Sequence, residues 1–216
     1  DFTCVSIRVP LDHFDASNRS TLSIEVAIHR AAHRPARGIL VTLVGGPGSS
    51  GVLDAPSAIG RWSPAVRRAY DLVYLDQRGV AASSGIFCPR AYTATRRAEG
   101  FPDFDLARVS RRFAHDCVRE LDDAAVLPYL GTRQAAEDVE AVRRALGGRR
   151  ITVYGQSYGT QLAAAYARQH PEGLAALILD GVIDTSLTPS AFWESSARGF
   201  ETVLRATLAV CAQHRL

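Results

Sequence analysis

The sequence has no lysine and no methionine among its 216 residues, so all 25 of its basic residues are arginine. The formal net charge is only +3, and many arginines stand beside acids, as they do between Glu137 and Arg144. This charge pattern argues against a nucleic-acid partner. No run of about 18 apolar residues is present, so we expect no membrane-spanning segment. Because methionine is absent, we expect Asp1 to follow processing or trimming of a longer chain.

Cysteine is scarce as well, and its four copies are Cys4, Cys88, Cys117 and Cys211. No C-x-x-C pair and no cluster with histidine occurs, so the sequence indicates no metal site, and it contains no motif for a cofactor. Among the three possible pairings we favour Cys88–Cys117, because these two cysteines bracket one excursion between core elements. Cys211 could pair with a segment outside this chain. Four reduced thiols in a cytosolic protein remain the alternative.

Six short runs of apolar or alternating residues predict strands. Phe2–Val9 and Thr21–His29 alternate between apolar and polar residues, which predicts a half-exposed antiparallel pair. The other runs are almost continuously apolar, as strands covered on both faces by helices are. They are Gly38–Val44, Leu72–Asp76, Ile151–Tyr154 and Leu174–Asp180.

Helical spacing occurs between these strands. From Ala135 to Leu146 apolar residues recur every three or four positions, with Thr132 as the expected N-cap and Gly147 as the stop. Further helices are expected over Gln161–Gln169, around Leu106–Leu121 and, as one or two helices, over Ala191–Gln213. This alternation predicts an α/β fold, in which a mostly parallel twisted sheet has helices on both faces and an antiparallel N-terminal edge.

The segment Gly155-Gln156-Ser157-Tyr158-Gly159 stands between a predicted strand and a predicted helix. In this context G-x-S-x-G is the pattern of a nucleophile elbow, where the serine lies at the apex of a tight turn. The glycines allow the strand and the helix to pack closely. A helix N-terminus beneath Ser157 favours negative charge that develops nearby. We therefore predict that Ser157 is a catalytic nucleophile; an ordinary glycine-rich turn is the alternative.

A second glycine-rich segment, Gly45–Gly51, directly follows a buried strand. A phosphate-binding loop would need a lysine or a helix-opening G-x-G-x-x-G, and Pro47 offers no N–H group. An oxyanion hole needs one well-aimed N–H from this loop and one from the residue after the nucleophile. We therefore assign Gly46 and Tyr158 as the two donors. A purely structural turn is the alternative.

Other polar residues at strand ends have a simpler interpretation. Asp76 and Arg78 could contact a substrate, but pinning the adjacent loops together is the favoured role. Asp180 and Asp184 are expected to order a crossover rather than to act as the triad acid. None of the histidines stands where the base of such a site belongs, and each is interpreted as a surface or capping residue: His13, His29, His33, His115, His170 and His214.

Taken in order, six segments resemble motifs of the α/β-hydrolase-fold aminopeptidases, which include the prolyl iminopeptidases and the secreted tripeptidyl aminopeptidases of actinobacteria. They are Val9–Asp12 with Cys4 before it, Gly45–Gly51, Asp71–Val80, Asp138–Gly147, Tyr154–Thr160 and Leu179–Asp184. Two positions depart from the pattern. Ala81 stands where a second glycine is usual, and Val44 replaces the histidine of prolyl iminopeptidases, which favours the tripeptidyl branch.

The resemblance implies the N-terminal half of a secreted or periplasmic serine exopeptidase that cleaves short peptides or residues from free N-termini. It implies a core part at 1–184 and the beginning of an incomplete helical cap at 185–216. Since the acid and base of the family lie beyond the cap, we expect a second polypeptide to supply the Asp and His. We also expect this chain alone to be nearly inactive. The substrate would be a peptide or a small acyl compound. An esterase or amidase, and a non-catalytic binding module of the same fold, are the alternatives.

Overall fold

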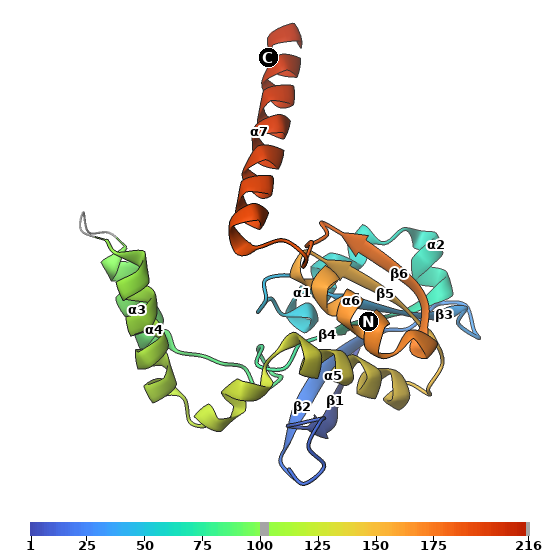
Figure 1. The fold of residues 1–216 in the computed structure, drawn as a ribbon. Coiled ribbons are helices and arrows are strands. Elements are labelled where there is room, and N and C mark those ends of the chain that lie inside the picture. Colours follow the sequence, from blue (N-terminus) through green and yellow to red (C-terminus); the bar gives the residue numbers. More distant parts are fainter. Residues whose placement is uncertain (100–103, 215–216) are drawn as a thin grey trace.

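The computed structural model describes residues 1–99 and 104–214 and places six strands in one sheet, in the order β1-β2-β4-β3-β5-β6 (Figure 1). β1 pairs antiparallel with β2, and β2 with β4, whereas the remaining pairs are parallel. The predicted mixed sheet with an antiparallel N-terminal edge is thereby confirmed. The strands are β1 (Thr3–Pro10), β2 (Thr21–His29), β3 (Gly38–Leu43), β4 (Tyr70–Leu75), β5 (Ile151–Gln156) and β6 (Leu174–Asp180).

Helices cover both faces of this sheet, as expected, with α1 on one face and α5 and α6 on the other (Figure 1). The α-helices are α1 (Gly51–Ala58), α2 (Pro64–Ala69), α3 (Pro89–Ala98), α4 (Leu106–Glu120), α5 (Thr132–Ala145), α6 (Tyr158–Gln169) and α7 (Pro189–His214). Within residues 1–99 and 104–214 there are also three short 3₁₀ helices, η1 (Ile59–Arg61), η2 (Ala124–Tyr129) and η3 (Pro171–Gly173). None of the described helices is both long and apolar enough to cross a membrane.

Sequence periodicity did not predict α1, α2 and α3. All three are short, with 8, 6 and 10 residues, and each contains a proline, which normally weakens a helical pattern. In α2 and α3 the proline lies in the first turn, where it is tolerated. One further expectation was wrong: Gly131, whose backbone is extended, and not Thr132, is the N-cap of α5. The Thr132 hydroxyl instead hydrogen-bonds the hydroxyl of Tyr158 at 2.7 Å.

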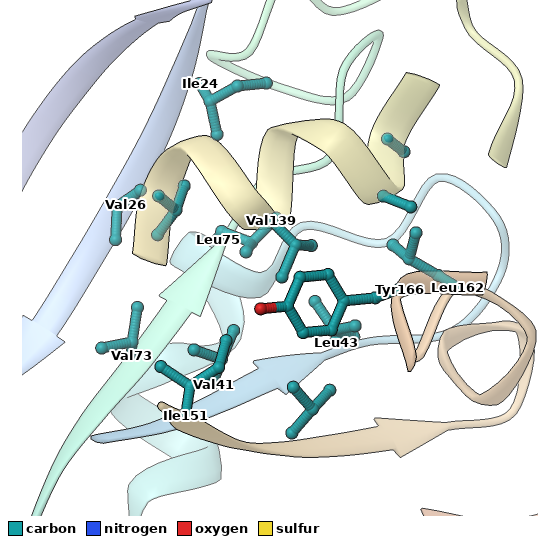
Figure 2. Close-up of a cluster of buried hydrophobic side chains, with 14 of the residues drawn as sticks. Ile24, Val26, Val41, Leu43, Val73, Leu75, Val139, Ile151, Leu162 and Tyr166 are labelled. Atoms are coloured by element: carbon teal, nitrogen blue, oxygen red, sulfur yellow. The ribbon is translucent and has the colours of Figure 1, made fainter. Parts of the chain in front are cut away.

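The main core lies between the sheet and the helices α5 and α6 (Figure 2). Strand residues such as Val41, Val73 and Ile151 pack against Val139 of α5 and against α6, and every one of them is fully buried. Tyr166 of α6 also lies in this cluster, and its ring is completely removed from solvent. A smaller cluster packs α1 on the opposite face of β3 and β4. This two-sided burial explains the continuous apolar runs of β3 and β4, in which every residue after the first is buried. The expectation that helices cover β6 on both faces was wrong: β6 is the last strand in the order, and its residues 175–178 are exposed.

The helices α3 and α4 form a hairpin that projects away from the sheet (Figure 1). The predicted disulfide joins Cys88, just before α3, to Cys117 of α4, whereas Cys4 and Cys211 are free. Between residues 86 and 130 the sequence predicted one helix, around Leu106–Leu121, whereas the described part contains α3, α4 and η2; residues 100–103 lie outside it. The last two residues of the expected cap segment 185–216 also lie outside the described part.

The Arg78 guanidinium lies inside the protein, with 0% of its side chain exposed. It donates to both carboxylate oxygens of Asp138 at 2.6 Å and to the carbonyl oxygens of Leu11 and Tyr129. The structural role expected for Arg78 is thus confirmed. His13 belongs to the same network, with Nε2 2.8 Å from Asp138, so its interpretation as a surface or capping residue was wrong. A buried charge needs such partners, which a sequence alone does not reveal.

Glu140 of α5 is a second buried charge, 2% exposed, and generates a prediction. The hydrogen bond that Glu140 accepts from Arg143 is the main cause that lowers its pKa from 4.5 to about 2. A hydrogen bond from Arg144 lowers the pKa as well, whereas burial opposes the shift. The carboxylate therefore contributes about 3 kcal/mol of stability above pH 4.5, and this contribution disappears as the pH falls toward 2. Glu140→Gln should lower the free energy of unfolding at pH 7, and its difference from wild type should shrink below pH 4.5.

Urea denaturation across this pH range measures the effect. Glu194→Gln is the control, because Glu194 is 66% exposed and pairs with Arg198 one turn away on α7. Such an exposed pair contributes less than about 1 kcal/mol. A stability difference between wild type and Glu140→Gln that does not change with pH would contradict the role of this carboxylate.

Candidate functional site

Ser157 is the single residue that connects β5 to α6. Its backbone has a conformation that serine rarely adopts, with φ 54° and ψ −123°. Its N–H donates to the carbonyl oxygen of Asp180 at the end of β6, at 2.8 Å. Its carbonyl oxygen accepts from the N–H and the hydroxyl of Thr160 in the first turn of α6. The main chain of Ser157 is therefore held on both sides, while the residue itself is exposed. This is the geometry expected of a nucleophile elbow.

The two glycines of the elbow are required by close backbone contacts. A Cβ on Gly159 would lie 2.0 Å from the carbonyl oxygen of Leu43, and one on Gly155 would lie 2.4 Å from that of Gly159. Real Cβ atoms do not approach other atoms so closely. The start of α6 thus lies directly against the ends of β3 and β5, and the chain must turn within a single residue, which is Ser157.

We call Gly45–Gly51 the glycine loop; it connects β3 to α1 and passes beside Ser157. A Cβ on Gly45 would lie 2.9 Å from the Cβ and 3.3 Å from the Oγ of Ser157. Gly46 has φ +114°, a conformation that a side chain would strain. Among the described residues, neither the N–H of Gly46 nor that of Tyr158 donates to a backbone carbonyl group. Gly46 lines the same cavity as Ser157, and Tyr158 directly follows Ser157 in the chain.

A cavity of about 370 Å³ opens beside Ser157. Its walls come from the ends of β3, β4 and β5, from the glycine loop, and from α1 with the turn that follows it. One wall is aromatic, where Trp62 packs edge-on against Tyr154 with ring centroids 5.2 Å apart. The lining residues are Thr42, Val44, Gly45, Gly46, Ser49, Asp54, Ala58, Arg61, Trp62, Tyr74, Tyr154, Gln156 and Ser157. The cavity is large enough for a small acyl group or an amino-acid side chain.

Asp180 connects this cavity to the elbow. Its carbonyl oxygen accepts from Ser157, and its Oδ2 accepts from the Tyr154 hydroxyl at 2.6 Å. Burial, followed by the hydrogen bond to Asp180, raises the pKa of Tyr154 to about 12, so the phenol keeps its proton at neutral pH. This contact orders the chain where β6 ends, the role expected for Asp180. The carboxylate of Asp184 accepts instead from Ser186, two residues on.

The site contains no complete catalytic triad among the described residues. None of the histidines whose side chains are described lines the cavity; His170, for example, caps the far end of α6 and contacts Glu137. Within residues 1–99 and 104–214, no group of three His, Cys, Asp or Glu residues could hold a metal ion. The arrangement offers a serine hydroxyl, two N–H groups and a cavity, which suits acyl transfer once a base is supplied.

Comparison with known proteins places the chain among hydrolases. The model of the alpha/beta hydrolase fold family matches residues 38–216. Serine protease Hip1 of Mycobacterium tuberculosis is 31% identical over 219 residues, which cover 98% of this chain and 42% of that protein. Tripeptidyl aminopeptidase of Streptomyces coelicolor is 29% identical over 199 residues, covering 85% of this chain and 35% of that protein.

A third relative is named for a different activity. Carboxylesterase B of Mycobacterium tuberculosis is 31% identical over 224 residues, which cover 97% of this chain and 42% of that protein. The chain therefore spans 42% or less of the length of each of these three curated relatives. All three are named as hydrolases, but one is named as an esterase and two are named as peptidases.

The backbone strain at Ser157 generates a prediction. A non-glycine residue in this conformation costs about 1–3 kcal/mol, part of which glycine gives back through its greater freedom in the unfolded chain. Ser157→Gly should therefore unfold in urea with a free energy about 1 kcal/mol higher than Ser157→Ala, although both variants lack the hydroxyl.

Ser196, inside α7, provides the matched control, because there glycine should be about 1 kcal/mol less stable than alanine. An alanine variant of Ser157 as stable as the glycine variant would show that the elbow carries no strain.

Proposed function

Because this chain belongs to the α/β-hydrolase fold family, as its sequence motifs predicted, we propose that it carries the nucleophile of a serine exopeptidase acting on free N-termini of peptides. One observation carries the proposal: exposed Ser157, at φ 54° on the elbow, lies against the glycine loop beside a cavity of about 370 Å³. The names of two relatives, a serine protease and a tripeptidyl aminopeptidase, support a peptide substrate.

In the proposed mechanism the Oγ of Ser157 attacks the scissile carbonyl carbon, and an acyl-enzyme forms as the amine leaves. The N–H groups of Gly46 and Tyr158 stabilise the oxyanion, each contributing about 3 kcal/mol by analogy with other hydrolases. A histidine takes the serine proton and passes it to the leaving amine, and an aspartate orients that histidine. We propose that both lie outside residues 1–216, in a second polypeptide or in further sequence of the same protein.

Two further proposals follow from the fold. Residues 1–184 would be the N-terminal part of the catalytic core, and 185–216 would begin a helical cap over the site. α7 supports this, since it extends away from the sheet (Figure 1). It also exposes large apolar side chains that another element could cover, among them Trp193 and Phe200. We also propose that the protein works in an oxidising compartment outside the cytoplasm, which the Cys88–Cys117 disulfide supports.

An esterase is the second candidate, favoured by the carboxylesterase named among the relatives and by the small size of the cavity. The two activities use the same nucleophile and oxyanion hole but differ in what surrounds the acyl group. Turnover of a peptide amide with a free N-terminus, a peptide with a blocked N-terminus, and p-nitrophenyl butyrate would separate them. The exopeptidase proposal expects the free-N-terminus substrate to react fastest among the peptides. Turnover of the ester alone would favour the esterase.

The test of the nucleophile is labelling by a fluorophosphonate probe, read as the intact mass of the protein. The full-length protein should gain one probe per molecule at Ser157, and Ser157→Ala should gain none. The isolated 216-residue chain should react far more slowly, because a serine without its base is a weak nucleophile. Labelling of the isolated chain at the full rate would show that the base does not lie outside it. Failure of the complete protein to react would favour a non-catalytic module.

A further inference from the structure

The glycine loop is tied at both ends to side chains that follow β4. Before the loop, Gln77 donates from Nε2 to the carbonyl oxygen of Val44 at 3.2 Å. At its end, Asp76 accepts through Oδ1 from the hydroxyl of Ser50 at 2.6 Å and from the N–H of Val52 at 3.0 Å. Asp76 and Gln77 are 1% and 5% exposed, so water does not compete for these hydrogen bonds. The loop is therefore fixed to the sheet on either side of its glycines.

Ser50 makes the tie at the loop's end rigid. It is the N-cap of α1, so its Oγ accepts from the N–H of Leu53 at 3.0 Å while its proton goes to Asp76. The carboxylate also faces the positive end of the α1 dipole, which stabilises its charge. Gly51 lies directly against β4, since a Cβ there would come within 2.4 Å of the carbonyl oxygen of Leu75. The start of α1 thus has one position relative to β4.

The part of the loop between these ties lies against the nucleophile. Gly45 packs against Ser157, and the next residue, Gly46, carries one of the two N–H groups assigned to the oxyanion hole. Hydrogen bonds of an oxyanion hole are effective only when the donors are held in place before the reaction. A displacement of about 1 Å in a catalytic group can reduce the rate up to 10²-fold. Whatever fixes this loop therefore affects the rate.

We propose that Asp76 is a positioning residue, which acts through Ser50 and the start of α1 to fix the Gly46 N–H relative to Ser157. Gln77 holds the other end of the loop. This inference rests on the proposed function, because it matters only if an oxyanion forms at Ser157. It assigns the Asp-Gln pair after β4 to the oxyanion hole, while Arg78, the next residue, serves the core through Asp138.

The test measures hydrolysis of p-nitrophenyl butyrate by the full-length protein. Asp76→Ala should lower kcat about tenfold or more at nearly constant KM, because the hydrogen bonds of the hole strengthen in the transition state. The inhibition constant of phenylboronic acid, which forms a tetrahedral adduct with serine, should rise by about the same factor. Asp76→Asn keeps an oxygen acceptor and should retain kcat within about threefold, and Ser50→Ala should impair kcat in the same direction as Asp76→Ala.

Asp71 provides the matched control, since it is a buried aspartate at the opposite end of β4. It accepts from the N–H of Ala31 and pairs with Arg30 and Arg34, away from the glycine loop. Asp71→Ala should be less stable than the wild type. Its kcat, calculated per mole of protein that fluorophosphonate labels, should equal the wild-type kcat. An equal loss of kcat in both alanine variants, or an Asn variant as slow as Asp76→Ala, would overturn the inference.

Different results would reject the proposed function and the role of Asp76. Wild-type protein that is not labelled at Ser157 would reject the proposed function and, with it, the role of Asp76. Wild-type protein that is labelled, together with an Asp76→Ala variant of unchanged kcat, would reject the role of Asp76 alone.

Discussion

The architecture around Ser157 depends on one close contact, the approach of α6 to the end of β3. Gly159 lies so near the carbonyl oxygen of Leu43 that even a methyl group there would clash, at 2.0 Å. Because strand β5 and helix α6 meet in this confined space, the chain has a single residue in which to reverse its direction. That residue takes a positive φ, and its side chain is left exposed beside the cavity. The strain is local, and the packed core on both faces of the sheet holds it.

The order of the strands determines which groups meet the serine. β5 lies between β3 and β6, so the loop after β3 and the end of β6 both reach the elbow. The first brings Gly45, and the second brings the carbonyl oxygen that fixes the Ser157 N–H. β4, the next strand beyond β3, ends in Asp76 and Gln77, which hold the glycine loop. Ligand sites form at the carboxyl ends of parallel strands for this reason: neighbouring strands deliver their loops to the same edge.

Much of this could be predicted from the sequence, because local patterns carry it. Runs of apolar or alternating residues predicted the six strands, and β2 and β6 have the predicted bounds. The elbow was recognised from glycine spacing. Long-range partners could not be predicted: Asp138 lies 60 residues from Arg78, and Thr132 lies 26 residues from the Tyr158 hydroxyl that it binds. Such pairs depend on how helices and strands pack against one another, and the periodicity of apolar residues contains no information about this packing. The short proline-containing helices were missed because their stability comes from packing and capping.

The most direct test of the account is a crystal structure of the full-length protein after it has reacted with a fluorophosphonate. The phosphorus should be bonded to the Oγ of Ser157. One phosphoryl oxygen should lie about 3 Å from the nitrogen atoms of both Gly46 and Tyr158, with the glycine loop still tied to Asp76. A phosphoryl oxygen that points away from these two N–H groups, or a probe attached to another residue, would contradict the central claim that the elbow and the glycine loop form one catalytic site.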